Sequence, residues 1–216
     1  MLEQMSAFFE KRLAGYDEHM LTEIEGADEF YAYTASLLPT EPDSRVLDLG
    51  CGTGHELEAY LSIQPRAKIT GIDLSRAMLD RLASKCEGKD IRLVCASYFD
   101  TPFENGAYDA AVSVESLHHF ERERKLGLYA RLYDALKPAG YFVLTDYFAE
   151  SPELETEYFR NLAELKRAQG ITDDAFYHYD TPLTVDHETQ ILREAGFKGV
   201  DIRNNWGATY TLVARK

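Results

Sequence analysis

The sequence predicts an α/β fold with a doubly wound, mostly parallel sheet of seven strands, an antiparallel last strand and a helical N-terminal extension. Two observations support this prediction. Beyond the first 40 or so residues, segments with a strand pattern alternate with segments with a helix pattern, which is typical of a parallel sheet. Several strand segments are nearly continuous apolar runs, as expected when helices cover both faces of the sheet.

The strands are assigned in order along the chain. Apolar runs predict five parallel strands at residues 45–49, 68–72, 91–95, 108–114 and 140–146. Near the C-terminus, the stretch "FKGVDIRNNWGATYTLVARK" predicts two more strands joined around Asn204–Gly207. Such a short connection makes antiparallel neighbours, so this pair completes the sheet.

Helical patterns fill most segments between the strands, at residues 55–64, 75–86, 121–137 and 186–195. The second of these begins with Ser75, a residue type favoured at N-caps, and places Met78 and Leu82 on one face. Two regions fall outside the alternation. Residues 1–42 predict two or three helices, and residues 152–169 predict a long one, so we expect helical material at both flanks of the sheet.

The composition disfavours nucleic acid as a partner. The chain has 216 residues, 37 of them acidic and 23 basic, and a net charge of −14. A strongly acidic protein repels phosphate backbones unless it carries a local basic patch. The densest basic stretch, residues 121–125, is interleaved with acids and is typical of a solvated helix face. No feature of the sequence indicates an oligomer.

The cysteines and the N-terminal stretch predict a cytoplasmic protein. Cys51, Cys86 and Cys95 are odd in number and lack metal-ligand spacing, so we expect reduced thiols rather than a disulfide framework. The first residues carry acids where a signal peptide has an apolar run. No apolar stretch approaches the roughly 18 residues of a membrane span.

The stretch "VLDLGCGTG", residues 46–54, places three glycines in five positions directly after a strand. A triphosphate-binding loop is excluded because no Lys follows the glycines. The dinucleotide fingerprint needs a glycine where this chain has His55, so an NAD(P)-linked oxidoreductase is a weaker alternative. Asp48, two residues before the first glycine, would repel a pyrophosphate but suits a ligand with positive charge.

Four ordered motifs resemble those of the class I methyltransferases that depend on S-adenosylmethionine (SAM). They are "VLDLGCGTG", "GIDLSRAML" (71–79), "YDAAVSVESLHHF" and "LKPAGYFVLTD", and the resemblance covers about residues 44–146. It implies a Rossmann-like methyltransferase fold and SAM as cofactor. It also implies transfer of a methyl group by in-line displacement, with S-adenosylhomocysteine as product.

The resemblance also implies cofactor-binding residues. Gly50 and Gly52 let backbone amides approach the cofactor, and Asp48 suits its α-amino group. Asp73, 23 positions after Gly50, can accept hydrogen bonds from both ribose hydroxyls, although an acid there also suits a helix N-terminus. The other cofactor-binding residues expected are Tyr16, Cys51, Leu74, Met78, Ser97, Tyr98, Val114 and Glu115. Ser97 and Tyr98 stand where the family often has an acid for the adenine amino group.

The resemblance implies a division of the single domain into four parts. Residues 1–42 form a helical N-terminal cap, and residues 43–146 form the cofactor-binding core. Residues 147–182 form a helical flank over the acceptor site, followed by the last helix and the antiparallel strand pair at 183–216. Because the cap and the flank are rich in aromatic residues, we expect a small, partly apolar acceptor with a nitrogen or oxygen nucleophile.

No strong catalytic signature is present, and none is required, because positioning alone supplies effective molarities of about 10⁵ M or more. The candidates for a general base are His118 and His119 after the fourth strand, Asp146 at the end of the fifth, and His178 or Asp180 in the flanking segment. His178, Asp180 and His187 lack a strict ligand spacing, so no metal site is predicted.

Two further alternatives remain open. The runs "LKRAQGITDD" and "ETQILREAGF" resemble the C-terminal part of the carboxy-SAM synthases, which serve tRNA modification. Those enzymes hold an extra carboxylate with an arginine in the intervening segment, and residues 171–182 contain none. A SAM-binding module without catalytic activity would show the same binding motifs.

Overall fold

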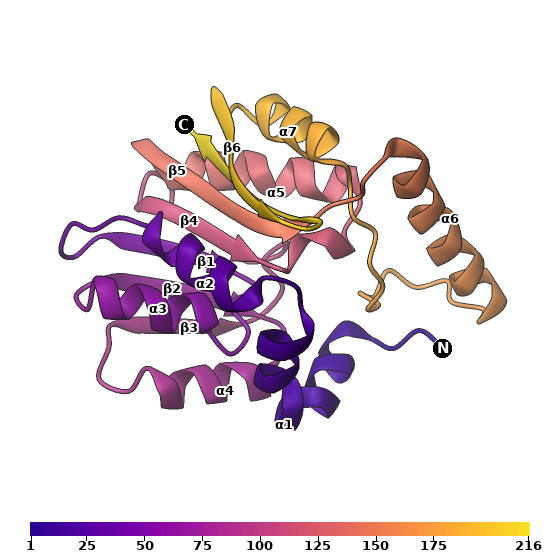
Figure 1. Cartoon of the computed structure of the whole chain (residues 1–216), viewed down its shortest axis with the longest axis horizontal. Helices are drawn as coiled ribbons and strands as arrows, with labels where there is room; N and C mark the ends of the chain where they lie inside the picture. The colour runs from indigo at the N-terminus through magenta and orange to yellow at the C-terminus, as the bar shows by residue number, and fades with distance from the viewer.

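The seven strands form one sheet in the order β3-β2-β1-β4-β5-β7-β6 in the computed structural model, which describes all 216 residues (Figure 1). The strands are β1 (Arg45–Leu49), β2 (Lys68–Asp73), β3 (Ile91–Cys95), β4 (Tyr108–Val114), β5 (Leu136–Tyr147), β6 (Gly199–Trp206) and β7 (Thr209–Arg215). Strands β1 to β5 pair in parallel, and β7 lies antiparallel between β5 and β6. The predicted fold class is therefore confirmed.

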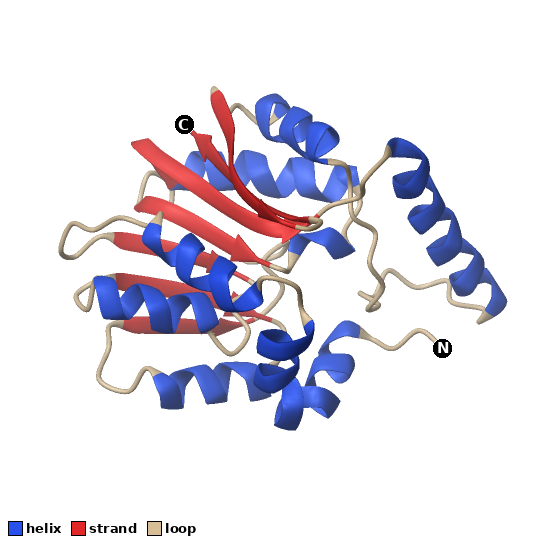
Figure 2. Ribbon diagram, in the orientation of Figure 1, coloured by secondary structure: helices blue, strands red, loops and turns tan.

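Helices cover both faces of this sheet (Figure 2). They are α1 (Met5–Glu23), α2 (Ala27–Ser36), α3 (His55–Ile63), α4 (Arg76–Lys85), α5 (Arg122–Ala135), α6 (Pro152–Ala168) and α7 (Val185–Glu194), with a short 3-10 helix η1 (Leu117–His119). One apolar core joins the sheet to α5 and α7, and a second joins it to α2, α3 and α4. No helix is long and apolar enough to cross a membrane.

Strand β1 contributes to both cores, which explains its continuous apolar sequence. Leu47 and Leu49 belong to the core beneath α5 and α7, whereas Val46 belongs to the core beneath α3 and α4. Because side chains alternate across a strand, Asp48 faces the same side as Val46. An acidic residue therefore lies in an otherwise apolar layer, and its position needs a separate explanation.

Element boundaries agree closely with the sequence pattern at α4. Ser75 Oγ accepts a hydrogen bond from the Met78 amide at 3.3 Å, as an N-cap does. Strand β5 begins four residues earlier than the predicted 140–146, at Leu136, which pairs with Tyr108 before an irregularity in the register.

The connection between the last two strands differs from the prediction. Asn204, Asn205 and Trp206 belong to β6, and the turn falls at Gly207 and Ala208. An irregularity between Ile202 and Asn204 lets the strand continue. The Trp206 ring also packs edge-on against Phe30 of α2, which favours the extended conformation of β6 over an earlier turn.

Residues 169–184 return from α6 to α7, and this return segment lies against the N-terminus. Met5 donates its amide to the Phe176 carbonyl at 2.8 Å, and His178 donates to the Glu3 carbonyl at 2.9 Å. Further along this segment, the Thr181 amide donates to the His118 carbonyl at 2.8 Å. These long-range bonds place the start of α1, the return segment and η1 together beside the sheet. Helix α6 stands apart from the sheet and has no buried residue (Figure 1).

Candidate active site

The glycine loop follows β1, and its first position, Gly50, requires a residue without a side chain. Gly50 has a φ of +79°, and a Cβ built there would overlap the Ser116 hydroxyl from the loop after β4. The amides of Gly50 and Cys51 both donate to the Ile72 carbonyl, at 2.8 and 3.2 Å. The loop is thus held against the end of β2, with the backbone of Gly50 and Gly52 facing a cavity.

Asp73 at the end of β2 is oriented by backbone amides. One carboxylate oxygen accepts from the Gly52 amide at 3.0 Å, and the other accepts from the Ser75 amide at 2.7 Å. Burial raises the pKa of Asp73, and these backbone hydrogen bonds oppose that shift. Since each carboxylate oxygen can accept more than one hydrogen bond, Asp73 can still receive two hydroxyl donors.

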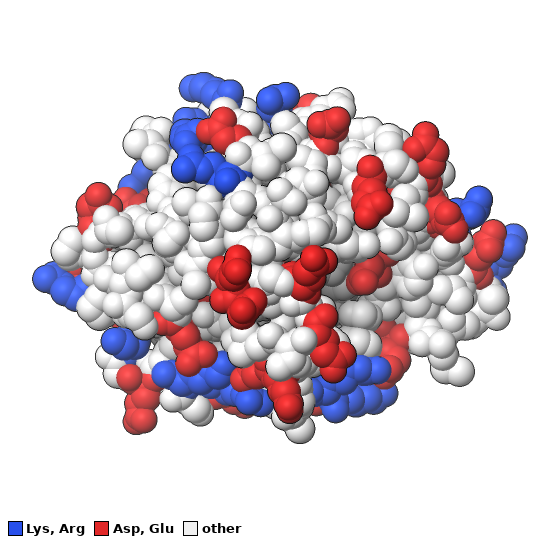
Figure 3. Space-filling model, viewed as in Figure 1, with Lys and Arg blue, Asp and Glu red and all other residues white.

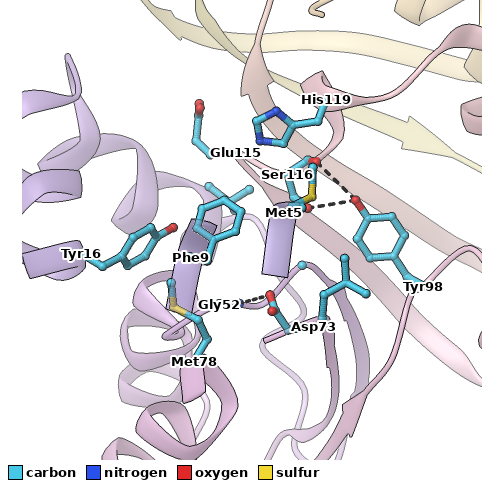
Figure 4. A pocket seen from close by; sticks show the side chains of 13 residues that line it. Met5, Phe9, Tyr16, Gly52, Asp73, Met78, Tyr98, Glu115, Ser116 and His119 are labelled. Carbon is cyan, nitrogen blue, oxygen red and sulfur yellow. Dashed lines mark hydrogen bonds between the residues drawn. The ribbon is translucent and has the colours of Figure 1, made fainter. Parts of the chain in front are cut away.

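A partly open cavity lies between the glycine loop, Asp73 and α1 (Figure 4). Its lining is Met5, Phe9, Tyr16, Gly50, Gly52, Asp73, Leu74, Met78, Tyr98, Val114, Glu115, Ser116 and His119. All but three of the cofactor residues expected from the sequence are in this lining. The three outside it are Asp48, Cys51 and Ser97.

None of these three side chains lines the cavity. Ser97 Oγ accepts from the Phe99 amide at 3.1 Å, and the buried Cys51 thiol packs against Gly71. Asp48 is fully buried, and no backbone amide or basic side chain donates to its carboxylate; its polar neighbour is the buried Glu56 carboxyl. Burial, followed by the neighbouring Glu56 carboxylate, raises the pKa of Asp48 well above its ordinary value. A buried carboxylate without a basic partner beneath the glycine loop fits a ligand that carries a cation.

Three of the candidates for catalysis, His118, His119 and Asp146, lie together but have different surroundings. Asp146 is buried and accepts from the amides of Leu117 and Tyr147, at 2.9 and 3.0 Å. It also bonds His118 Nδ1 at 2.6 Å, so it fixes the orientation of that ring. Burial lowers the pKa of His118, but Asp146 and then Asp180 outweigh burial and raise it well above the ordinary value.

His119 has the opposite electrostatic environment. Burial, and then the charge of His118, lower its pKa. Its Nδ1 lies 3.2 Å from the Asp180 carboxylate and 3.3 Å from the Tyr179 carbonyl. His119 therefore favours the neutral form, which can accept a proton or a cation.

A second, larger and more open cavity adjoins the first. It measures about 1900 Å³ and is lined by parts of α1, the loop after β4, the return segment and the β6–β7 turn. Phe9, Tyr16, Glu115 and His119 line both cavities. Glu115 has a φ of +49° and accepts from Thr209 Oγ1 at 3.1 Å. Burial raises its pKa to about 7, while His118 opposes that rise.

Sequence reasoning identified part of the wall of the larger cavity. Of the aromatic residues in the expected cap and flank, Phe8, Phe9, Tyr16 and Tyr147 line it. Tyr31, Phe148, Phe176, Tyr177 and Tyr179 line neither cavity. The lining residues that the sequence did not indicate include Met5, Ser116, Trp206 and Thr209. No local motif marks Met5, Trp206 and Thr209, because long-range pairing of the N-terminus and of the β6–β7 turn brings them to the site. Ser116 lies within the motif "YDAAVSVESLHHF", which did not single it out.

The cavity beside the glycine loop fits an adenosyl cofactor with a positively charged amino acid end. Gly50 occupies a position that a Cβ would block, Asp73 has capacity for two hydroxyl donors, and the Asp48 carboxylate lies nearby without a basic partner. Leu74 and Met78 give the cavity apolar walls. The arrangement therefore agrees with the ligand that the sequence motifs imply.

Comparisons with known proteins identify the family of the chain. A family model described as a methyltransferase domain matches residues 46–140. The carboxy-S-adenosyl-L-methionine synthase of Aeromonas hydrophila subsp. hydrophila is 30% identical over 176 residues, covering 75% of this chain and 70% of that protein. The biotin biosynthesis bifunctional protein BioHC of Teredinibacter turnerae is 29% identical over 76% of this chain, and the match spans 28% of BioHC.

A solved structure shows the same fold. The SAM-dependent methyltransferase of Thermotoga maritima matches with a TM-score of 0.70 and 17% identity, covering 98% of this chain and 99% of that one. This likeness extends the agreement beyond the glycine loop to the flanking helices and the closing strands. The chain belongs to the class I family of SAM-dependent methyltransferases.

Proposed function

We propose that this protein transfers the methyl group of SAM to a nitrogen or oxygen of a small acceptor bound in the larger cavity. The observation that carries the proposal is the junction of the two cavities, where Tyr16, Glu115 and His119 line both. A cofactor in the smaller cavity and an acceptor in the larger one would meet there. Alignment of two bound reactants is the main requirement of a displacement reaction.

Residues of the smaller cavity would hold the cofactor. Asp73 would accept hydrogen bonds from the ribose hydroxyls, and the backbone of Gly50 and Gly52 would lie against the methionine part. Leu74 and Met78 would pack against the adenine, beside the loop that contains Tyr98. When bound, SAM supplies a methyl group on a sulfonium, which is a good leaving group.

The Tyr16 ring would lie at the junction with the acceptor cavity. Its hydroxyl is 4.0 Å from the position that a Cβ of Gly52 would take, so the ring stands directly over the glycine loop. An aromatic face there would favour a cation by about 0.5–2 kcal/mol. Phe9 and Met5 of α1 line the same cavity (Figure 4).

Proton transfer from the acceptor would use groups at the junction. Glu115 and His119 line both cavities, and each can accept a proton from an amine or a hydroxyl. His118 is held by Asp146 on one side and faces Asp180 on the other, so its positive charge is stabilised and it is a poor base. Asp146 would act as a positioning residue because it lines neither cavity.

The size and charge of the site favour a small molecule over a nucleic acid. Aromatic rings of Phe8, Phe9 and Tyr147 line the larger cavity. Figure 3 shows acidic side chains around the middle of this face, whereas Lys and Arg gather near its edges. A phosphate backbone would be repelled, consistent with the net charge of −14.

The likeness to a carboxy-SAM synthase suggests a second function, synthesis of a carboxylated SAM. An additional carboxylate would need a cation in the cavity, and Lys11 and Arg12 are the Lys and Arg residues in its lining. Both are bonded to Glu3, at 2.6 and 3.1 Å, on an exposed surface. Methyl transfer is therefore the better-supported proposal.

One experiment distinguishes these functions. The purified protein is incubated with SAM labelled in its methyl group and a panel of small amines, phenols and carboxylic acids, and products are identified by mass spectrometry. The proposal predicts labelled acceptor and S-adenosylhomocysteine, with both products lost in the Glu115→Gln, His119→Gln double variant even at SAM concentrations that saturate it, as a parallel SAM titration of the variant checks. A cofactor product heavier by one carboxyl group would support the synthase instead. Bound SAM without any product would indicate a binding module.

A further inference from the structure

We propose that His118, His119 and Asp180 form a binding site for one divalent transition-metal ion of the zinc class, on the wall of the larger cavity. Each residue offers one ligand atom, and the three atoms lie within 4.8 Å of one another. His119 Nδ1 lies 3.2 Å from Asp180 Oδ1, and His118 Nε2 lies 3.5 Å from the same oxygen. Two imidazoles and a carboxylate are a ligand set that binds zinc and related ions.

The spacing of these atoms matches a tetrahedral site. Zinc binds nitrogen and oxygen ligands at about 2.0–2.2 Å, which places tetrahedral ligands roughly 3.3–3.6 Å from each other. The two observed separations, 3.2 and 3.5 Å, lie close to this range. The Asp180 side chain is about half exposed, and the His119 Nδ1 proton, which faces the Tyr179 carbonyl at 3.3 Å, would leave when the ion binds.

The surroundings of His118 are those of a metal ligand. Asp146 bonds Nδ1 at 2.6 Å and leaves Nε2 directed toward Asp180. Asp146 is itself fixed by the amides of Leu117 and Tyr147. Histidine ligands of metals usually donate their other ring nitrogen to such a carboxylate, which fixes the tautomer and the ring orientation.

The charge around the cluster also favours a cation. Glu115, Asp146 and Asp180 lie around the two imidazoles, and none of the three carboxylates forms an ion pair with Lys or Arg. A divalent ion would balance this excess of negative charge in a partly buried site.

The backbone holds the two halves of the site together. His118 and His119 belong to η1, whereas Asp180 belongs to the return segment. Thr181, which follows Asp180 in the chain, donates its amide to the His118 carbonyl at 2.8 Å. All three ligands line the larger cavity, so a fourth coordination position faces it. Three protein ligands with an open position are typical of catalytic rather than structural zinc sites.

The function of this open position rests on the proposed methyl transfer. There the ion would bind the acceptor's oxygen or nitrogen and orient it toward the junction of the cavities. His119 would then be a ligand, which leaves Glu115 to take the proton. Metal binding itself does not depend on that function.

The test is metal binding by the full chain. After treatment with EDTA and its removal, the protein is titrated with Zn²⁺ by calorimetry, and with Co²⁺ while its visible absorption is recorded. We expect one equivalent to bind and the wild type to become more heat-stable. Asp180→Asn and His119→Gln should weaken binding by more than the roughly 10–100-fold that outer-shell partners contribute. Asp146→Asn should weaken it within that range.

A matched control is His187→Gln. His187 also bonds a carboxylate, that of Glu155 at 2.8 Å, but lies away from the cavity, so its loss should leave the affinity unchanged. Absence of stoichiometric binding, or full binding by Asp180→Asn and His119→Gln, would overturn the proposal. SAM titrated into the same samples separates the two proposals, because cofactor binding without metal binding refutes only the metal site.

Discussion

The buried Asp48 carboxylate makes a quantitative prediction about stability and cofactor binding. In the structure it is fully buried with no backbone amide or basic side chain donating to it, and burial and Glu56 raise its pKa. We predict that Asp48→Asn stabilises the protein in the absence of SAM and weakens its binding of SAM. The substitution keeps the shape of the side chain and removes only its ability to ionise.

The magnitude follows from proton linkage. A carboxyl group with a raised pKa in the folded state gives stability that is complete below its ordinary pKa and is lost as the pH rises through the folded pKa. Each unit by which the folded pKa exceeds the ordinary value costs about 1.4 kcal/mol once the group is ionised. The amide is still buried, so we expect a net gain in stability of at least about 1 kcal/mol at pH 7.

Cofactor binding should change in the opposite direction. Loss of a charged partner costs about 1.5–3 kcal/mol, which corresponds to a roughly 10–150-fold weaker binding of SAM. Binding to the wild type should also release a proton near pH 7, because a cation beside Asp48 favours its ionised form. The Asp48→Asn variant should release fewer protons than the wild type when it binds SAM.

Urea unfolding between pH 4 and 7 and calorimetry in buffers of different ionisation enthalpy measure these effects. The stability difference between variant and wild type should increase with pH. A variant that is less stable than the wild type at pH 7, or that binds SAM equally well, would refute this account of Asp48.

Three other predictions concern the site and its support. Asp73→Ala should lower the affinity for SAM at least about 100-fold in calorimetry, since two hydrogen bonds to a charged group are lost. Glu188→Ala leaves the fully buried Lys125 without its partner at 2.7 Å and should cost about 3–5 kcal/mol in urea unfolding. Asp17→Ala breaks the 2.5 Å bond to Thr53 that ties α1 to the glycine loop, and should weaken SAM binding roughly tenfold. Unchanged values in these assays would contradict the corresponding contacts.

Much of the fold could be predicted because its signals are local. Continuous apolar runs identified β1 to β4, and Ser75 marked the start of α4. The turn between β6 and β7 was misplaced because Trp206 packs against α2, and no pattern near Trp206 indicates that contact.

The same distinction between local signals and long-range contacts applies to the residues of the site. Gly50, Gly52 and Asp73 belong to short motifs, and the structure brings all three to one cavity. The approach of Asp180 to His118 and His119 could not be predicted, because it depends on the return segment pairing with η1 across 63 residues. The metal ligands considered from the sequence were His178, Asp180 and His187, whereas in the structure Asp180 lies beside His118 and His119 instead.

Isothermal titration with SAM, S-adenosylhomocysteine and NADH, for the wild type and Asp73→Ala, tests the cofactor site most directly. The account predicts micromolar binding of both adenosyl ligands to the wild type, strong weakening of both in the variant, and no binding of NADH. Binding of NADH alone, or equal binding of SAM by both proteins, would contradict the assignment of the glycine loop and Asp73 to SAM.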